Sequence, residues 1–280
     1  LRVTRGCHWN KCYFCDLYKK YKFSRRRYEE IEEDLKKAAD SEYAQNYTTC
    51  FLQDGDAFVL QTEFLMQILE GIHKYLPNIK HVTTYARADS IARKSVSELR
   101  ELKTAGIEHL YCGMETGSDL ILRKINKGFD AATIIISGTK AKEAGMVLSE
   151  FTLFGIGGKE LAEENAVETA KVLNVIKPDF VRVHATGIKL SSEMWNYVKN
   201  KELTLQSEEE IVSEQKIMLE LLADDMDCIY MNEHIVNLLL EVRGNIRTDK
   251  QNMLETINTY LQLPKQEQEL FNLGRRLNIL

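Results

Sequence analysis

Short apolar runs alternate with amphipathic stretches along the first two-thirds of the chain. The apolar runs predict strands over residues 1–4, 48–53, 81–85, 107–112, 147–154 and 180–184. The stretches between them predict helices over residues 27–39, 62–75, 95–104, 131–144 and 161–175. Strands that alternate with helices indicate a parallel sheet, and ligands of such folds gather at the carboxyl ends of the strands.

Six strand–helix units are two short of a closed eight-stranded barrel. No clear strand follows residue 184, so the pattern predicts an α/β fold with an open, partial (β/α)6 TIM-like barrel. We expect this core to occupy residues 1–189 and a helical C-terminal extension to occupy residues 190–280. Gly106 and Gly145 each follow a predicted helix and precede a strand, as helix-terminating glycines do.

The extension carries its own helix signals. Ser207 and Glu210 have the spacing of a capping box, Thr248 can cap a further helix, and Pro264 suits the first turn of a last helix. The apolar stripes of these helices are more typical of a core than of a partner surface.

Composition excludes some classes of protein. The chain has 280 residues, 44% of them hydrophobic, which is enough for one large α/β domain or one domain with an appendage. No run of about 18 apolar residues occurs, so we expect no membrane span. The net charge of −5 gives no overall nucleic-acid footprint. The chain begins at Leu1 without a methionine, so we expect some N-terminal sequence to be missing.

Three of the six cysteines, Cys7, Cys12 and Cys15, lie within nine residues. Three thiolates can hold three irons of a cubane iron–sulfur cluster and leave the fourth iron open to a small molecule. A zinc site that takes His8 as its fourth ligand and a redox dithiol are the other uses of such spacing. Neither of these two accounts for the rest of the sequence.

The other cysteines stand alone in the sequence. We expect Cys50, Cys112 and Cys228 to pack as small hydrophobic side chains. Six cysteines in a chain of this length favour intracellular metal binding over a disulfide framework, and we expect a cytoplasmic protein.

With Phe14 before its last cysteine, the cysteine motif resembles that of the radical S-adenosylmethionine (SAM) superfamily. The usual motif has three and then two residues between its cysteines, whereas this chain has four and two. It is similar to a subgroup that reads Gly-Cys-Pro-Trp-Asn-x-Cys-x-Phe-Cys, with His8 in place of the proline. The added residue removes no ligand.

The resemblance implies a [4Fe–4S] cluster held by Cys7, Cys12 and Cys15, with SAM chelating the open iron and Phe14 near the adenine. An electron from the cluster would cleave the C–S bond of SAM and give a 5′-deoxyadenosyl radical that abstracts hydrogen from a substrate. It also implies an electron donor such as flavodoxin or ferredoxin. The substrate, a small molecule, a peptide or a tRNA, is not identified.

Two segments after the second and third strands resemble parts of the family's SAM site. The segment Asp54-Gly55-Asp56 resembles the Gly-Gly-Glu segment that contacts the methionine amine, and otherwise it is an ordinary turn. Arg87 either pairs with the methionine carboxylate or forms a surface salt bridge with Asp89 or another acid.

The fourth strand ends in Gly113-Met114-Glu115-Thr116-Gly117-Ser118. This resembles the Gly-Ile-Glu-Ser-Gly segment of methylthiotransferases and of the elongator radical domain, and Asn126-Lys127-Gly128 strengthens the likeness. The resemblance implies that Glu115 bonds the ribose hydroxyls or the amino-acid part of SAM. Ser118 can instead cap the next helix.

Gly155 and Gly157 follow the fifth strand, and the resemblance places them against the adenosine. Leu161 stands where a dinucleotide fingerprint has its third glycine, which weakens that alternative. His184 closes the sixth strand, where the family makes backbone contacts to adenine. It is alternatively an acid or base on the substrate side, or a core histidine.

Two other functions stay open. Residues 19–27 hold six Lys or Arg interleaved with aromatics, which suits a tRNA-modifying enzyme of the same chemistry or simply a solvated loop. The chain is alternatively a non-catalytic iron–sulfur or zinc-binding scaffold or carrier, which would bind metal without turning over a cofactor.

Overall fold

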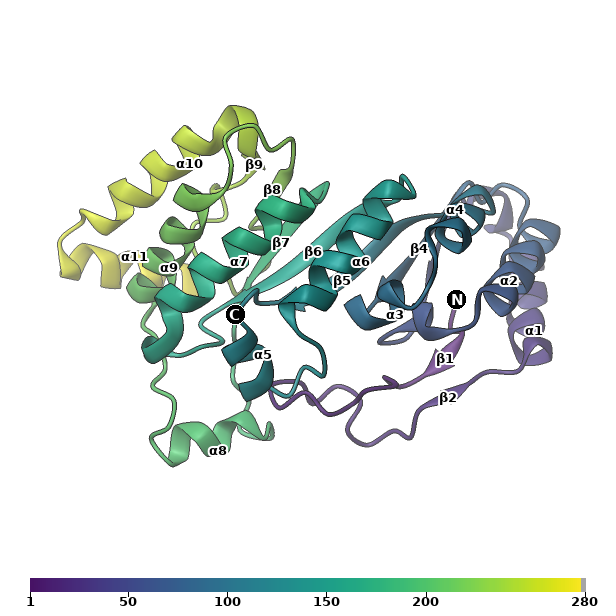
Figure 1. Cartoon of the computed structure of the whole chain (residues 1–280), viewed down its shortest axis with the longest axis horizontal. Helices are drawn as coiled ribbons and strands as arrows, with labels where there is room; N and C mark the ends of the chain where they lie inside the picture. The colour runs from purple at the N-terminus through teal and green to yellow at the C-terminus, as the bar shows by residue number, and fades with distance from the viewer. Residues whose placement is uncertain (278–280) are drawn as a thin grey trace. The chain divides into compact units, whose positions relative to one another are not determined.

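A computed structural model describes residues 1–277, and these form an α/β fold around a seven-stranded sheet (Figure 1). The strands follow one another in chain order across the sheet as β3 (Thr49–Leu52), β4 (His81–Ala86), β5 (Ile107–Glu115), β6 (Val147–Phe154), β7 (Phe180–Ala185), β8 (Ile229–Met231) and β9 (Gly244–Asn245). β4 pairs in parallel with β3 and β5, and β8 pairs in parallel with β7. The predicted α/β class is therefore confirmed.

Helices fill the connections between the strands. The α-helices are α1 (Tyr28–Ala39), α2 (Thr62–Tyr75), α3 (Ala88–Ala92), α4 (Val96–Thr104), α5 (Asp119–Lys124), α6 (Ala131–Glu143), α7 (Ala162–Ile176), α8 (Met194–Lys199), α9 (Glu208–Leu221), α10 (Ile246–Leu261) and α11 (Lys265–Leu277). Three 3₁₀ turns accompany them in the described residues: η1 (Ala44–Asn46), η2 (Ala57–Val59) and η3 (Lys159–Leu161).

The chain divides into two compact units. Unit 1 comprises Leu1–Gly113 and Ala132–Ser149, and unit 2 comprises Met114–Ala131 and Glu150–Leu280. Each unit is described by itself. The predicted division into residues 1–189 and 190–280 follows a different principle, the change from strand–helix alternation to helices, and stays a prediction.

In unit 1 the helices α1 and α2 pack closely over a buried apolar layer. A Cβ on Gly71 of α2 would lie 2.7 Å from the Tyr28 hydroxyl oxygen, so the small residue permits this approach. Burial of apolar surface stabilises the layer, which includes Ile31, Leu35, Leu65, Ile68, Leu69 and Ile72. Gly106 and Gly145 adopt φ angles of +117° and +74°, as expected for residues that end helices.

The first predicted strand was wrong in its extent. The strand β1 covers Thr4–Arg5 and pairs antiparallel with β2 (Ser24–Arg25), outside the large sheet. Arg2 nevertheless forms an isolated parallel bridge with Gln53, and the Leu1 ammonium donates to the Phe51 carbonyl at 2.8 Å. The first residues therefore run beside β3 before they turn into the two-stranded sheet.

In unit 2 the expectation that no strand follows residue 184 was wrong. The short strand β8 pairs in parallel with β7, and β9 pairs antiparallel with β8. β9 leads directly into α10, so the cap of that helix is Asn245, whose Oδ1 accepts from the Arg247 N–H at 2.9 Å, and not Thr248.

Two other helix signals in unit 2 have clear outcomes. The capping box is confirmed, because Ser207 N–H donates to Glu210 at 2.6 Å and Glu210 N–H donates to the Ser207 hydroxyl at 3.2 Å. Pro264 lies just before α11 instead of within its first turn, and its carbonyl accepts from the Glu267 N–H at 2.8 Å.

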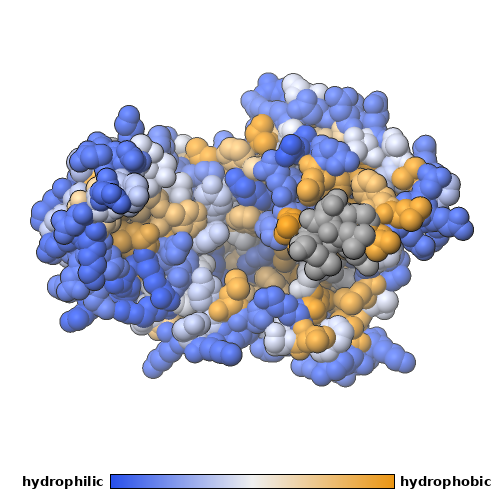
Figure 2. All heavy atoms as spheres, turned by 180° about the vertical axis from the view of Figure 1, so that it is seen from behind, coloured by the Kyte–Doolittle hydropathy of each residue, from blue (hydrophilic) through white to orange (hydrophobic). Residues whose placement is uncertain are grey.

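Among the described residues, no helix combines the length and apolarity that a membrane crossing requires. The face drawn in Figure 2 carries mainly hydrophilic side chains, with hydrophobic ones gathered in smaller patches between them. The isolated cysteines largely match expectation, since Cys112 and Cys228 are buried and Cys50 is partly buried.

Candidate functional site

The three clustered cysteines occupy one loop of unit 1, closed at its base by the pairing of β1 with β2. None of the three forms a disulfide; Cys12 is buried, and Cys7 and Cys15 are partly exposed. Asn10 holds the loop in shape, because its amide donates to the Tyr18 carbonyl at 2.7 Å and to the Tyr21 carbonyl at 3.2 Å. Phe14 is partly exposed in the same loop.

The residue before Cys7 is tied to the end of β3. The Gly6 N–H donates to Oδ2 of Asp54 at 2.9 Å, and the Arg2 guanidinium contacts the same oxygen at 2.8 Å. The Asp54 N–H in turn donates to the Thr4 hydroxyl at 3.1 Å. Asp54 thereby fixes the chain on the N-terminal side of Cys7.

The residue after Cys7 is tied to the fully buried Asp56. The Nδ1 of His8 lies 2.9 Å from Oδ2 of Asp56, which also accepts from the Ser90 hydroxyl at 2.6 Å. The Arg87 N–H donates to the other carboxylate oxygen at 3.3 Å. Nε2 of His8 faces Asp89 at 3.6 Å. Cys7 is therefore flanked by two anchored residues.

These contacts also set the charge state of the loop. Burial alone would lower the pKa of His8, but the carboxylates of Asp56 and Asp89 outweigh it and raise that pKa above its ordinary value. Although burial opposes ionisation of Asp89, its contacts with His8, Arg87 and Arg93 lower its pKa to about 2. The two carboxylates thus favour the protonated over the neutral imidazole of His8.

Gly55 lets the turn after β3 press against the cysteine loop. A Cβ at this position would lie 2.7 Å from the Tyr18 ring and 3.1 Å from the Cys7 Cβ. Burial, with the nearby Asp54 carboxylate, raises the pKa of Tyr18. The Asp54-Gly55-Asp56 segment thus supports the cysteine loop directly, and its contact with a methionine amine stays a prediction.

Arg87 forms a salt bridge with Asp89, one of the partners that the sequence offered, but the pair is largely buried and not at the surface as that alternative had it. Its Nε donates to Oδ1 of Asp89 at 2.9 Å, and the side chain is only 5% exposed. The guanidinium carbon also lies 5.4 Å from the centre of the Trp9 ring, within the range of a cation–π contact. Arg87 therefore touches the cysteine loop at Trp9.

The donor set suits an iron–sulfur cluster. A cubane binds each of its cysteines through a different iron, so a loop with three cysteines and no disulfide offers the required ligands. Within residues 1–277, no three His, Cys, Asp or Glu side chains converge as ligands of a single metal ion do.

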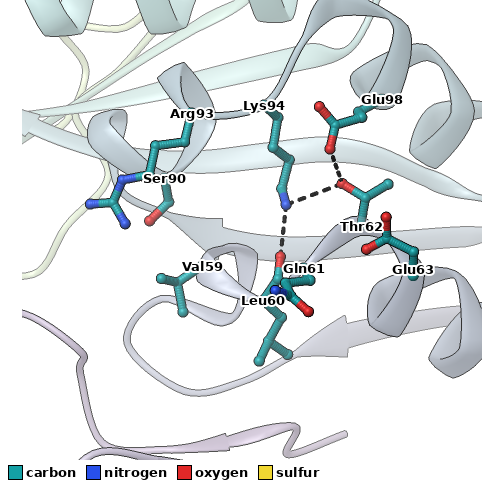
Figure 3. A pocket seen from close by; sticks show the side chains of 9 residues that line it. All are labelled: Val59, Leu60, Gln61, Thr62, Glu63, Ser90, Arg93, Lys94 and Glu98. Atoms are coloured by element: carbon teal, nitrogen blue, oxygen red, sulfur yellow. Dashed lines mark hydrogen bonds between the residues drawn. The ribbon is translucent and has the colours of Figure 1, made fainter.

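Unit 1 holds a cavity of about 560 Å³, whose lining side chains Figure 3 shows. Ser90 and Arg93 form part of its wall, and these two side chains also bond Asp56 and Asp89. The buried Lys94 ammonium donates to the Leu60 carbonyl at 2.7 Å and burial lowers its pKa. Lys94 thereby joins the turn before α4 to the turn before α2.

In unit 2, Glu115 closes β5 in a left-handed conformation, with φ of +66°. Its carboxylate accepts from the Lys127 ammonium at 2.6 Å, and both side chains are largely buried. Ser118 does cap α5, accepting from the Ile121 N–H at 3.3 Å, and it also donates to Glu164 at 2.8 Å. The motif-like segments that hold Glu115 and Lys127 are thus joined by this pair, and a contact of Glu115 with SAM stays a prediction.

The glycine turn after β6 is held by a carboxylate of α9. Gly155 has φ of +80°, and its N–H donates to Oε2 of Glu214 at 3.0 Å. Gly157 lies so close to the following turn that a Cβ would be 2.9 Å from the Leu161 Cβ. Both glycines therefore have conformational or steric reasons for being glycine, and their contact with adenosine stays a prediction.

Glu214 is the residue of this region that the sequence analysis missed. It is buried on α9 and also accepts from the Asn165 amide at 2.5 Å and the Gln206 amide at 2.8 Å. Burial raises its pKa to about 7, although these hydrogen bonds favour the charged form. The available signal was a polar residue inside the apolar stripe of a predicted helix.

His184 lies at the end of β7, in unit 2, as the sequence placed it. Its ring contacts those of His234 and Phe151, with centroids 4.2 Å and 5.4 Å away. Burial, followed by the neighbouring His234 and Arg182, lowers its pKa to about 4. It is a partly buried imidazole beside a second imidazole, not an isolated core histidine.

The predicted site residues thus fall into two groups. One group lies together in unit 1 around the cysteine loop, and its members are Cys7, Cys12, Cys15, Phe14, Asp54, Gly55, Asp56 and Arg87. The other group lies in unit 2, and its members are Glu115, Gly155, Gly157 and His184.

Structural likeness to solved enzymes shows the fold. The methylornithine synthase PylB is 15% identical with a TM-score of 0.55, over 92% of this chain and 68% of that one. The archaeal Elp3 of Methanocaldococcus infernus is 12% identical with a TM-score of 0.54, over 84% of this chain and 58% of that one. Such neighbours are partial barrels, which confirms the predicted fold.

Sequence comparison points the same way. The curated heme chaperone HemW of Bacillus subtilis (strain 168) is 22% identical over 214 residues, or 74% of this chain, and the chain spans 55% of that protein's length. Residues 1–173 match the family model of the Radical SAM superfamily, whose members use a [4Fe–4S] cluster and SAM. Since that match covers more than half of the sequence, the chain belongs to the radical SAM superfamily.

Proposed function

We propose that this chain is a radical SAM enzyme in which Cys7, Cys12 and Cys15 hold the cluster. When bound, the reduced [4Fe–4S] cluster supplies one electron that cleaves SAM to methionine and a 5′-deoxyadenosyl radical, which abstracts hydrogen from a substrate. The single observation that carries this proposal is the anchored loop of unit 1 that brings together three cysteines outside any disulfide.

The residues around the thiols have supporting tasks. Asp54 holds the backbone before Cys7, Asp56 holds the His8 side chain after it, and Gly55 gives the thiol-bearing loop room to approach the turn. Arg87 and Phe14 are proposed to face the methionine carboxylate and the adenine. In unit 2, Glu115, Gly155, Gly157 and His184 are proposed to contact the rest of SAM.

The wider setting of the reaction is also proposed. The electron is supplied by a small donor such as flavodoxin or ferredoxin, and the protein acts in the cytoplasm. Residues 1–189 form the radical core, and residues 190–280 form its extension. The substrate is a small molecule, a peptide or a tRNA.

The experiment is anaerobic reconstitution of the full chain with iron and sulfide, reduction with dithionite, and quantification of 5′-deoxyadenosine after SAM is added. We expect its formation to depend on both reductant and SAM. An intact cluster, verified by its absorbance and by iron and sulfide content, that yields no 5′-deoxyadenosine under any of these conditions contradicts the proposal.

Cys12→Ala should remove both the cluster and the cleavage, because only two thiolates would remain in the loop. Cys50→Ala is the matched control, since Cys50 lies outside the loop and should leave iron content unchanged. Retained cleavage in Cys12→Ala would refute the ligand assignment.

A second candidate is a non-catalytic iron–sulfur or zinc-binding carrier. The likeness to HemW favours it, because that relative is a heme chaperone. This candidate requires that the full chain binds metal and SAM-independent cargo while forming no 5′-deoxyadenosine. The same reconstitution experiment therefore separates it from the enzyme.

The third candidate is a tRNA-modifying radical SAM enzyme. Lys19, Lys20 and Lys22 are exposed on the cysteine loop, which favours contact with phosphates. Arg26 is instead engaged internally, since its guanidinium donates to the Arg2 carbonyl at 2.7 Å. A tRNA-binding assay across a salt series tests this candidate, and the absence of binding at low salt would eliminate it.

A further inference from the structure

One face of the strands β3, β4 and β5 in unit 1 is rich in aromatic side chains. The register of these parallel strands places Phe51, Thr83 and His109 in one row. Tyr85 and Tyr111 are paired in the next row of the same face, nearer the carboxyl ends of the strands. Side chains in one row, and side chains two residues apart on a strand, project from the same face. The four rings therefore share one face of the sheet.

The opposite face of these strands is closed, whereas the aromatic face is open. Leu52, Thr84 and Leu110 form a row of the opposite face, and each is fully buried. Tyr85, in contrast, is 42% exposed, and the other three rings are partly exposed. Parallel strands are usually buried on both faces, so an open face of large aromatic side chains indicates a surface that receives a ligand.

The four rings contact one another and form a continuous surface, here called the aromatic platform. The centroid of the Phe51 ring lies 4.8 Å from that of Tyr85 and 5.6 Å from that of Tyr111. The His109 ring stacks on Tyr111 at 4.3 Å with an interplanar angle of 20°. Contacts of this kind stabilise aromatic pairs, so the rings hold one another in place before a ligand arrives.

The aromatic platform continues into the cysteine loop through Tyr18. A Cβ on Gly55, in the turn after β3, would lie 2.7 Å from the Tyr18 ring and 3.1 Å from the Cys7 Cβ. Tyr18 also interacts electrostatically with Cys7 and with Tyr85. A ligand on the platform therefore lies beside the loop whose cysteines are proposed to hold the cluster.

The chemistry of the aromatic platform favours a flat conjugated ring. Its rings have negative faces and positive edges, and another aromatic ring gains stacked or edge-to-face contacts with them that a saturated group of the same size lacks. Such contacts use the faces and edges of the rings. Hydrogen bonds that their polar atoms already make, such as that between His109 Nε2 and the Ser149 hydroxyl at 2.8 Å, do not compete with them.

We propose that the aromatic platform binds the substrate through a flat aromatic or heteroaromatic ring, so that the substrate is a small molecule that contains such a ring. Two observations select this occupant: the four contacting rings of the open face, and the continuity of that face with the cysteine loop. The assignment of the ring to the substrate rests on the proposed function. Binding of the ring itself requires neither SAM nor the cluster.

The test compares two neutral alcohols with the same carbon skeleton, the flat 2-naphthol and the saturated 2-decalol. Each is titrated into the full chain while NMR follows the C2–H signals of His109 and of His73 on α2, which is the control. We expect a saturable shift of the His109 signal with 2-naphthol and about ten-fold weaker binding of 2-decalol. Equal affinities, or shifts at His73 as large as at His109, would overturn the proposal.

Three variants locate the binding. Tyr85→Ala should weaken 2-naphthol by about ten-fold, because it removes the most exposed ring of the platform. Tyr85→Phe keeps that ring and should bind as the original chain does. Tyr43→Ala is the matched control, since it removes a tyrosine that is 58% exposed in the same unit but lies outside the three strands. Unchanged affinity in Tyr85→Ala, or equal weakening in Tyr43→Ala, would contradict the site.

Adenosine distinguishes the substrate from the other flat rings that this protein could meet, the adenine of SAM and the bases of an RNA. We expect adenosine to displace 2-naphthol only at a much higher concentration. Displacement at an equal or lower concentration would assign the platform to a base and contradict the proposal. Because these titrations use neither SAM nor the cluster, their failure leaves 5′-deoxyadenosine formation unaffected and is distinguishable from failure of the proposed function.

Discussion

The backbone N–H of Gly155 donates to Oε2 of Glu214, a residue 59 positions later in the chain, over 3.0 Å. The bond connects the glycine turn after β6 with the helix α9. Two side-chain amides, from Asn165 and Gln206, complete the shell of donors around the same carboxylate. One buried acid therefore organises three separate segments of unit 2.

Replacing this acid should destabilise the protein. Glu214→Ala would remove the acceptor of the buried Gly155 N–H and of the partly buried Gln206 amide, and one of the two acceptors of the Asn165 amide. We expect the free energy of unfolding to fall by about 3 kcal/mol.

Glu220→Ala on the same helix is the control, because its partner Lys216 lies 3.7 Å away at the surface. This change should alter the free energy of unfolding by about 0.5 kcal/mol at most. Urea unfolding measures both, and equal losses would contradict the role of Glu214.

The same carboxyl makes stability depend on pH. Its pKa is about 7 in the folded chain against an ordinary 4.5, so the folded state binds the extra proton between these values. The stabilisation that comes from this extra proton is complete below pH 4.5 and is lost as the pH rises through 7. The free energy of unfolding falls by about 3 kcal/mol in total over this range.

Relative to Glu214→Gln, which cannot titrate, the original chain should therefore lose stability from pH 5 to pH 8. Urea unfolding of both proteins across this range measures the difference. If the stability of the original chain relative to Glu214→Gln stays constant or increases from pH 5 to pH 8, the folded pKa of Glu214 is not raised.

Asp56 should control how well the chain takes up iron. Asp56→Ala removes the acceptor of the Ser90 hydroxyl and the Arg87 N–H and frees His8, so the cysteine loop loses its anchor after Cys7. We expect less iron and sulfide per chain after reconstitution and about 2 kcal/mol lower stability. Asp40→Ala, at an exposed position after α1, is the control. Full iron loading of Asp56→Ala would contradict this role.

Gly117 should tolerate no side chain. A Cβ there would lie 2.2 Å from the Glu168 carbonyl oxygen of α7, a backbone atom that cannot move aside, and we expect Gly117→Ala to cost about 3 kcal/mol. Gly187→Ala is a matched control because its Cβ would meet nothing within 4 Å. Thermal unfolding compares the two, and similar midpoints would show that α7 can move away from this turn.

The strands and helices of the strand–helix repeat were predictable because each has strong local signals. β6 covers the predicted residues Val147–Phe154, and α2 covers Thr62–Tyr75 as expected. β8 was not predictable in this way. Its three residues, Ile229–Met231, are too few to show an alternating pattern, and only pairing with β7 gives them their conformation.

The candidate site shows the same division between local and distant information. The cysteine spacing and the glycines are properties of short segments, so the sequence could reveal them. The partners of Glu214, Asp54 and His8 are set by tertiary contacts between residues about 50 positions apart. A sequence pattern does not indicate such pairs. Thr248 was predicted to cap a helix, but β9 leads directly into α10, so Asn245 is the cap instead.

The anchoring of Gly6 and His8 has a consequence for how the metal centre is built. Because both neighbours of Cys7 are tied to the end of β3 by protein contacts alone, the first thiol has its place before any iron arrives. The entropy of ordering that ligand is lost during folding and not during metal uptake. Iron then binds first at the Cys7 thiol, whose position is already fixed, and the rest of the loop orders around that iron.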